Sequence, residues 1–269
     1  MSGRFPSFYL SHGGGPWPYM QPAARQPFAR LEQSLRQLPL QLPGKPEAIL
    51  VVSGHWEESE FAVMAGAAPP MIYDYGGFPE ELYHIRYPAA GAPRLAARVL
   101  SLLEQAKLPA RLDAERGFDH GTYAILAVTH PAADVPTFQV SIRADYDPQA
   151  HLQLGRALAP LRDEGVLIIG SGSSYHNLRR FFEQGGRRPD SALFDAWLRE
   201  TLTESAPAQR TARLREWLRA PAAREAHPRE DHLMPLHVAV GAAEEEAGRI
   251  VYRQEDFLGK IALSSYRFG

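Results

Sequence analysis

Five histidines of this chain lie in turn-like segments among small or polar residues, where an imidazole can reach a ligand. Neutral imidazoles bind zinc, iron, copper or nickel, and two histidines with one carboxylate and open positions form the site of non-heme Fe(II) oxygenases. The chain has no cysteine, so any metal must be held by His, Asp or Glu. The five are His12 in Ser-His-Gly-Gly-Gly, His55 in Ser-Gly-His-Trp-Glu, His120 in Phe-Asp-His-Gly, His176 in Ser-Tyr-His-Asn and His232 in Glu-Asp-His.

Three of these histidines, His12, His55 and His176, follow apolar segments that predict buried strands. Loops that leave the carboxyl ends of strands in an open α/β sheet line a common crevice where ligands bind. A single histidine after a strand is more often a capping or hydrogen-bonded residue, but the repeated placement favours a shared metal site. The spacing does not choose the metal. The three predicted strands are Phe8–Leu10, Ala48–Ser53 and Val166–Gly170.

Further strands and helices alternate around these three strands. This alternation predicts a single α/β domain over residues 1–269, with a mostly parallel central sheet between two layers of helices in an αβα arrangement. More strands are predicted at Thr137–Ile142 and Ile261–Tyr266. Helices are predicted at Phe28–Arg36, Pro93–Gln105, Thr122–Val128, Gln149–Arg162, Ser191–Glu204 and Gln209–Ala220, and after Pro235, which suits a first helical turn.

Two segments are interpreted as insertions, because each lies between segments that are typical of a protein core. Gly66–Ala92 is rich in proline and glycine and carries five aromatic side chains, which predict either a lid that shapes the substrate pocket or a small aromatic core that fixes a long loop. Ser205–Arg229 is rich in Arg, Ala and Glu. The five aromatic residues are Tyr73, Tyr75, Phe78, Tyr83 and Tyr87.

Composition narrows the classes of partner. The net charge is −2, the pI is near 6.6, and acidic and basic residues are mixed along the chain, so nothing favours nucleic acid or an anionic membrane. The N-terminal segment does not resemble a secretory signal, and no apolar run reaches the length of a membrane span. We therefore expect a small-molecule substrate and a cytoplasmic location.

Two glycine-rich segments resemble known motifs only in part. The segment after His12 lacks the Gly-Lys-Ser/Thr of a phosphate-binding loop. Glycines flank Ser171 directly, so the G-x-S-x-G spacing of a serine hydrolase is absent. Neither activity is expected.

The other histidines and one aspartate have simpler interpretations. Asp119 either caps the helix expected near Thr122 or orients an imidazole, and capping is favoured. His237 is expected to pack within the last helix. Surface positions, or supporting positions behind the site, are expected for His84, His130, His151 and His227.

As an ordered set, several segments make the chain similar to the class III extradiol ring-cleavage dioxygenases, and most closely to the 4,5-DOPA dioxygenase extradiol group. The segments span residues 10 to 236, which is nearly the whole chain. They are Leu10-Ser11-His12-Gly13, Val52-Ser53-Gly54-His55-Trp56, Tyr73-Asp74-Tyr75-Gly76-Gly77-Phe78-Pro79, Gly117-Phe118-Asp119-His120-Gly121, Ser171-Gly172 with His176-Asn177-Leu178, and Asp231-His232 with Pro235-Leu236.

The resemblance implies a single αβα domain that cleaves a catechol ring with O2 beside its two hydroxyl groups. It implies Fe(II) for activity, and Zn(II) as an ion that can occupy the site in the isolated protein. His12 and His55 correspond to metal ligands. The third ligand is expected to be His232, with the neighbouring carboxylates Glu57, Glu230 and Asp231 as alternatives.

The resemblance also implies roles for the two remaining histidines. His176 corresponds to the acid/base residue, for which the resemblance also implies contact with the metal when no substrate is bound. His120 corresponds to a histidine that handles oxygen or substrate. Two other functions stay open at this point. Three histidines also suit a zinc hydrolase, and a related fold could bind a metal or peptide without catalysis.

Overall fold

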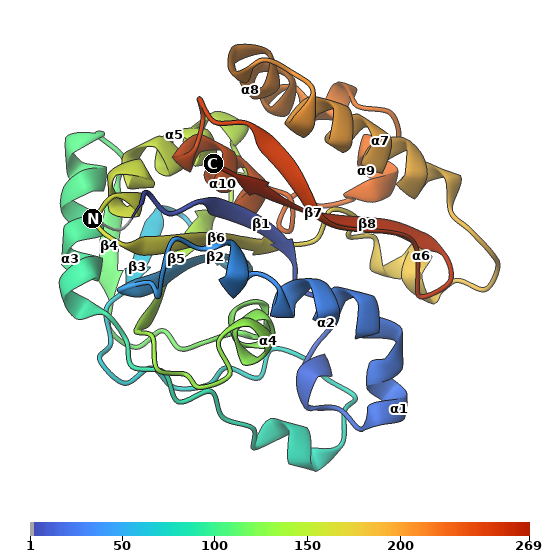
Figure 1. The fold of residues 1–269 in the computed structure, drawn as a ribbon, viewed down its shortest axis with the longest axis horizontal. Coiled ribbons are helices and arrows are strands. Elements are labelled where there is room, and N and C mark those ends of the chain that lie inside the picture. The colour runs from blue at the N-terminus through green and yellow to red at the C-terminus, as the bar shows by residue number, and fades with distance from the viewer. Residues whose placement is uncertain (1–2) are drawn as a thin grey trace.

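The computed structural model describes residues 3–269. One sheet of eight strands lies between two layers of helices (Figure 1), in the order β4-β3-β5-β2-β6-β1-β8-β7. The predicted α/β fold with a mostly parallel sheet is confirmed. The strands are β1 (Ser7–Ser11), β2 (Ala48–Glu58), β3 (Phe61–Met64), β4 (Ala110–Asp113), β5 (Thr137–Arg143), β6 (Val166–Gly172), β7 (Gly248–Phe257) and β8 (Ile261–Phe268).

The middle of the sheet is parallel. Strand β6 lies between β2 and β1 and pairs with both in parallel, while β5 pairs in parallel with the other side of β2. These strands are apolar and almost wholly buried because helices cover both of their faces. Antiparallel pairing occurs where β8 joins β1, where β7 joins β8, and at one position between β3 and β5.

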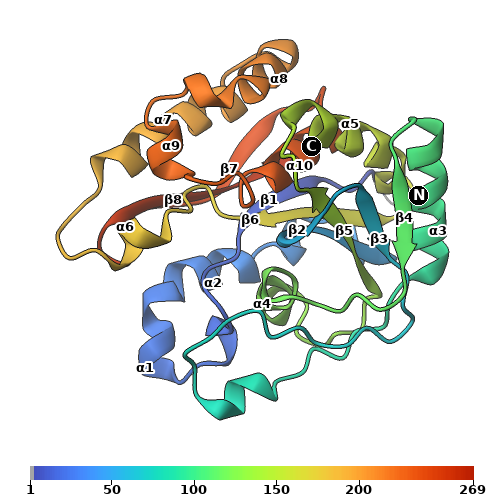
Figure 2. The ribbon, with the colours of Figure 1, turned by 180° about the vertical axis from the view of Figure 1, so that it is seen from behind.

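The helices divide between the two faces of the sheet (Figures 1 and 2). On one face, α10 packs on β1, β2 and β6, α3 packs on β3 and β4, and α5 packs on α10. Helix α7 covers β7 and β8 on the same side of the sheet as α10 and α5, and the opposite face carries α2 and α4. The longer helices are α2 (Ala29–Arg36), α3 (Pro93–Gln105), α4 (His120–Thr129), α5 (Pro148–Leu158), α7 (Pro189–Thr203), α8 (Pro207–Arg215) and α10 (Met234–Ala242); the short ones are α1 (Pro22–Arg25), α6 (Leu178–Phe182) and α9 (Ala223–Ala226).

Several predicted boundaries differ from the structure. Strand β2 does not end at Ser53 but continues to Glu58, because beyond a register shift it pairs again with β5. The predicted helix Gln149–Arg162 is α5 followed by a 3₁₀ turn at Ala159–Arg162, and Gln209–Ala220 is divided into α8 and a 3₁₀ turn at Trp217–Arg219. Strands β3, β4 and β7 were not predicted.

Helix α10 shows how tightly the layers pack. All nine of its residues are buried, so the helix is apolar on every side instead of amphipathic. It lies between the sheet and α5, where it fixes the segment that carries His232. Among the helices of residues 3–269, none has the length and apolar character needed to cross a bilayer.

Candidate metal centre

Three neighbouring strands in the parallel part of the sheet carry histidines to the same edge. His12 follows β1 directly, and His176 lies four residues beyond the end of β6. His55 lies within β2, in the part that extends past its pairing with β6. Because these strands are parallel, their carboxyl ends meet at one edge of the sheet, as the sequence predicted.

A fourth histidine, His232, is brought to this edge by close packing of its backbone against two strands. A Cβ on Gly54 would lie 2.9 Å from the Asp231 carbonyl oxygen, and one on Gly172 would lie 2.1 Å from the carbonyl oxygen of His232. These glycines therefore let the segment before α10 pack directly on β2 and β6. The hydroxyl of Tyr9 also donates a hydrogen bond of 2.8 Å to the His232 carbonyl, which fixes the segment.

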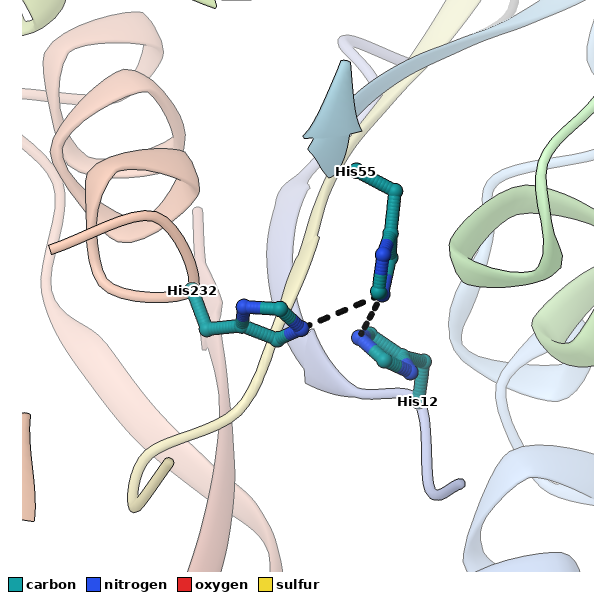
Figure 3. A group of neighbouring side chains, drawn as sticks. All are labelled: His12, His55 and His232. Atoms are coloured by element: carbon teal, nitrogen blue, oxygen red, sulfur yellow. Dashed lines mark hydrogen bonds between the residues drawn. The ribbon is translucent and has the colours of Figure 1, made fainter. Parts of the chain in front are cut away.

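The rings of His12, His55 and His232 point toward one another (Figure 3). The Nε2 atom of His55 lies 3.3 Å from that of His12 and 3.1 Å from that of His232. Two nitrogens that are each about 2.05 Å from one ion are about 2.9 Å apart at a right angle and about 3.3 Å apart at the tetrahedral angle. Both separations lie within this range, and the ligand atoms of all three histidines lie within 4.8 Å of one another, so the group could hold one metal ion.

Burial keeps these imidazoles neutral near pH 7. It lowers the pKa of His12 and of His55 well below the usual value, and the neighbouring imidazoles lower both pKa values further. Burial, followed by the effect of His176, lowers the pKa of His232 to about 4. A neutral imidazole offers a nitrogen lone pair to a metal, whereas an imidazolium does not.

Asp231 lies between two histidines. Its Oδ1 is 3.0 Å from Nδ1 of His232 and 3.5 Å from Nδ1 of His176, and these two rings stack with centroids 3.4 Å apart. Burial opposes ionisation of Asp231, but the neighbouring imidazoles of His176 and His232 lower its pKa far below the usual value. The backbone N–H of His232 also donates a hydrogen bond of 2.7 Å to Oδ1 of Asp231. The ionised carboxylate therefore favours a proton on Nδ1 of His232 and leaves Nε2 for a ligand.

Asp74 contacts two histidines of the cluster, as Asp231 does. No role was predicted for Asp74 from the sequence. Its Oδ1 is 2.8 Å from Nδ1 of His120, and its Oδ2 is 3.3 Å from Nδ1 of His55. Burial opposes ionisation of Asp74, but the hydrogen bonds from His120 lower its pKa below the usual value. The segment Gly66–Ala92, for which a lid and a small aromatic core were both predicted, thus supplies a carboxylate to two of the histidines.

Asp119, which is buried, links the start of α4 to strands β2 and β5 next to the site. It caps α4, as predicted, by accepting a hydrogen bond of 3.1 Å from the backbone of Thr122. The same carboxylate also accepts hydrogen bonds from Ser53 at 2.8 Å, Arg116 at 2.5 Å and Gln139 at 2.8 Å. This buried network ties the start of α4 to β2 and β5 beside His55 and His120.

The carboxylates that were alternatives for the third ligand have other partners. Glu57 pairs with Arg229, and Glu230 pairs with Arg224 at 2.6 Å. Asp231 contacts Nδ1 of His232 instead of sharing the three Nε2 atoms. The structure thus brings His232, and not one of these carboxylates, together with His12 and His55.

The histidine cluster forms part of the wall of a cavity of about 610 Å³. This volume suits a small aromatic molecule. Phenylalanines contribute much of the remaining wall, so the cavity combines apolar sides with polar groups at one end. The histidines in the lining are His12, His55, His120, His176 and His232, and the phenylalanines are Phe28, Phe78, Phe181, Phe182 and Phe257.

Comparison with known proteins agrees with this geometry. The family model for the catalytic LigB subunit of aromatic ring-opening dioxygenases matches residues 6–267. This chain belongs to that family. The resemblance to class III extradiol dioxygenases that the sequence motifs indicated is therefore confirmed.

Relatives of this LigB-family chain come from plants and bacteria. It is 40% identical to a 4,5-DOPA dioxygenase extradiol of Portulaca grandiflora, over 97% of this chain and 95% of that protein. The protein of the same name from Escherichia coli K12 is 34% identical, over 100% of this chain and 96% of the relative. A crystal structure of an uncharacterized E. coli K12 protein matches with a TM-score of 0.79 and 30% identity, covering 99% of this chain and all of the other.

The remaining histidines of this dioxygenase lie outside the cluster. His84 is exposed, which is one of the two positions expected for it. His151 and His227 are fully buried and hydrogen-bonded to backbone groups, so the surface alternative is wrong for both of them. His237 packs within α10, as predicted. Polar flanking sequence indicated exposure of His151, but its α5 packs against α10 and α3.

Proposed function

We propose that this chain uses Fe(II), held by His12, His55 and His232, to open a catechol ring with O2 beside its two hydroxyl groups. The convergence of three Nε2 atoms carries this proposal. The cavity that they line also contains His120 and His176. The family match over residues 6–267 supports one catalytic domain formed by the whole chain.

The donor atoms fit a divalent ion of this kind. The rings of His12 and His232 are buried and that of His55 is partly exposed. Carboxylates beside Nδ1 of His55 and of His232 favour tautomers that leave Nε2 available. Imidazole nitrogens suit iron and zinc alike, so zinc can occupy the same nitrogens in the isolated protein. Bound Fe(II) would supply the redox chemistry that couples O2 to a catechol.

His176 is the proposed acid/base residue. Its Nδ1 faces Asp231, and the residue lines the cavity together with the three proposed ligand histidines. An imidazole is effective in proton transfer near neutral pH. We assign to Nε2 the removal of the second hydroxyl proton of the catechol and its return to an oxygen atom as the ring opens.

His120 is proposed to hold oxygen or substrate in place. Its Nδ1 is engaged by Asp74, and its ring centroid is 4.0 Å from that of His55 and 5.2 Å from that of His12. This position lets the other ring nitrogen hydrogen-bond to a molecule beside the three ligand histidines. The contact with Asp74 fixes the direction of that nitrogen.

DOPA is the proposed substrate within the catechol class. The curated relatives from Portulaca grandiflora, Beta vulgaris and E. coli are named 4,5-DOPA dioxygenase extradiol. The apolar walls of the cavity suit the ring of such a molecule. Phe28, for example, packs on Phe257 with ring centroids 5.6 Å apart.

The test combines metal analysis with turnover. Protein purified without oxygen is loaded with Fe(II) or Zn(II) and incubated with DOPA and simpler catechols, while oxygen uptake and the yellow ring-opened product are followed. We expect both signals with Fe(II) only. Oxygen-independent hydrolysis with zinc, or no oxygen uptake with any catechol, would contradict the proposal.

Replacement of His176 tests its role separately. In His176→Gln, we expect kcat to fall by about 10²- to 10⁴-fold because the proton acceptor is lost. Iron content, measured by elemental analysis, should remain that of the unmodified protein. His84→Gln, which changes an exposed histidine, is the control. Unchanged kcat in His176→Gln would remove this residue from the mechanism.

A further inference from the structure

The charged side chains that line the catalytic cavity form two groups. The described lining contains the charged residues Glu57, Asp74, Arg229 and Asp231. Asp74 and Asp231 contact imidazoles of the cluster. Glu57 and Arg229 contact none of these histidines and form an ion pair with each other. Glu57 and Arg229 are therefore the charged residues of the cavity lining that can bind charged groups of a substrate.

Glu57 is held at a defined distance from the histidine cluster. It lies two residues beyond His55 on β2, and both residues line the cavity. Two residues of an extended strand cover about 7 Å, a separation that an aromatic ring with a short side chain can span. A catechol with its hydroxyl groups beside the three Nε2 atoms can therefore place its side chain near Glu57.

Tyr146 holds the ion pair in position. Its hydroxyl donates a hydrogen bond of 2.5 Å to Oε2 of Glu57, the oxygen that also accepts from Arg229, and the guanidinium of Arg229 lies 5.4 Å from the Tyr146 ring centroid. The side chain of Glu57 is 22% exposed and that of Arg229 is 59% exposed. Arg229 thus lies at the more open side of the pair.

We propose that Glu57 binds the ammonium group, and Arg229 the carboxylate, of a catechol amino acid whose ring hydroxyls face the ligand histidines. This assignment rests on the proposed function. A zwitterion gives each member of the ion pair a new partner of opposite charge, so neither is left unpaired in the cavity. A catechol with a single charged group leaves one of the two without a partner, which disfavours its binding.

A second arginine provides a matched control. Arg224 pairs with Glu230 at 2.6 Å and lies 5.1 Å from the ring centroid of Trp217, much as Arg229 pairs with Glu57 beside Tyr146. Arg224 lines a neighbouring open cleft of about 740 Å³ that shares Arg229 and His176 with the catalytic cavity, but Arg224 itself is not in the lining of that cavity. Arg224→Gln therefore removes the same kind of side chain without touching the proposed substrate site.

The experiment uses four catechols that differ in charge. They are L-DOPA with both groups, dopamine with the ammonium only, 3-(3,4-dihydroxyphenyl)propionate with the carboxylate only, and 4-methylcatechol with neither. Their Kd values for Fe(II)-loaded and for metal-free protein are measured by calorimetric titration without oxygen, and their kcat/KM values with oxygen. The variants are Glu57→Gln, Arg229→Gln and Arg224→Gln, each checked for Tm and iron content.

We expect a crossed pattern. Relative to 4-methylcatechol, Glu57→Gln should weaken binding of L-DOPA and dopamine by about tenfold or more, since a hydrogen bond to a charged group is lost. Arg229→Gln should weaken L-DOPA and the propionate by a similar factor. Arg224→Gln should leave the Kd values of all four catechols unchanged.

Equal effects of Glu57→Gln and Arg229→Gln on all four catechols would overturn the inference, because the ion pair would then serve only to stabilise the cavity. That result would leave ring cleavage itself intact. Failure of the unmodified Fe(II) protein to cleave any catechol would instead count against the proposed function. The anaerobic Kd values would still decide whether the pair recognises the charged groups.

Discussion

Two groups of histidines in this molecule, all buried except the partly exposed His55, differ in their partners. The cavity group is His12, His55 and His232, and the framework group is His151, His227 and His237. Burial lowers the pKa values of both groups, so all six side chains are neutral near pH 7. Burial and a lowered pKa therefore do not by themselves identify a metal ligand.

The framework group makes its contacts with backbone atoms. Nε2 of His151 accepts a hydrogen bond of 3.1 Å from the backbone N–H of Arg143, and its Nδ1 lies 2.7 Å from the carbonyl oxygen of Asp147. Both ring nitrogens of His151 therefore have backbone partners. In the cavity group, carboxylates face Nδ1 of His55 and His232, while the Nε2 atoms face one another. The nature of the partners therefore separates the proposed ligand histidines from the framework histidines.

The largest effect should come from replacing one cavity histidine. In His12→Ala, His55→Ala or His232→Ala, we expect iron affinity to fall by more than about 100-fold, since loss of a supporting residue alone costs 10- to 100-fold. Iron is measured by elemental analysis after anaerobic loading and dialysis.

The matched framework variant is His151→Gln. It should lose stability because it disturbs two buried hydrogen bonds, but a folded fraction should keep its iron. If His151→Gln lost iron as fully as the cavity variants at a temperature where it is folded, the distinction between the two groups would be wrong.

A smaller effect should come from the carboxylate that supports the cavity group. Asp74→Asn keeps the shape of the side chain but removes the negative charge beside Nδ1 of His55 and His120. We expect iron affinity or kcat to fall by about 10- to 100-fold. Competition with a chelator gives the affinity. Asp134→Asn, at an exposed ion pair with Lys45, is the control and should change neither. Full activity in Asp74→Asn would show that the carboxylate is not what distinguishes the cavity histidines.

The sequence predicted the main frame of the site for a simple reason. Long apolar segments such as Ala48–Val52 form buried strands in the parallel part of the sheet, and parallel strands place the residues that follow them at one edge. The sequence alone could therefore predict that His12, His55 and His176 lie at the same edge of the sheet. His232 follows no strand, and the family resemblance, not periodicity, indicated it.

Other parts depend on contacts that no local pattern carries. Asp74 lies in an irregular segment without periodicity, and only tertiary packing brings it to His120. Strand β7 was missed because register shifts near Ile250 and Gln254 break the alternation of buried and exposed residues. Strand β4 has four residues and lies at the sheet edge, so its apolar signal is weak.

The smallest effect concerns the pH dependence of stability and tests the framework group by itself. Burial lowers the pKa of His151 to about 4, below the value near 6.5 expected in the unfolded chain. Between these two values, the unfolded state binds the proton and the folded state does not. The free energy of unfolding should therefore fall as the pH falls from about 6.5 to about 4, by at most about 1.4 kcal/mol per pH unit from this residue.

Urea unfolding of metal-free protein at several pH values measures this slope, since a chelator removes the separate pH dependence of metal binding. In His151→Gln the slope in this window should be smaller than in the unmodified protein, because one group that binds a proton only on unfolding has been removed. His84→Gln changes an exposed side chain and should alter the slope far less. Equal slopes for His151→Gln and the unmodified protein would mean that burial does not keep His151 neutral, and the two groups of histidines would then differ in charge as well as in partners.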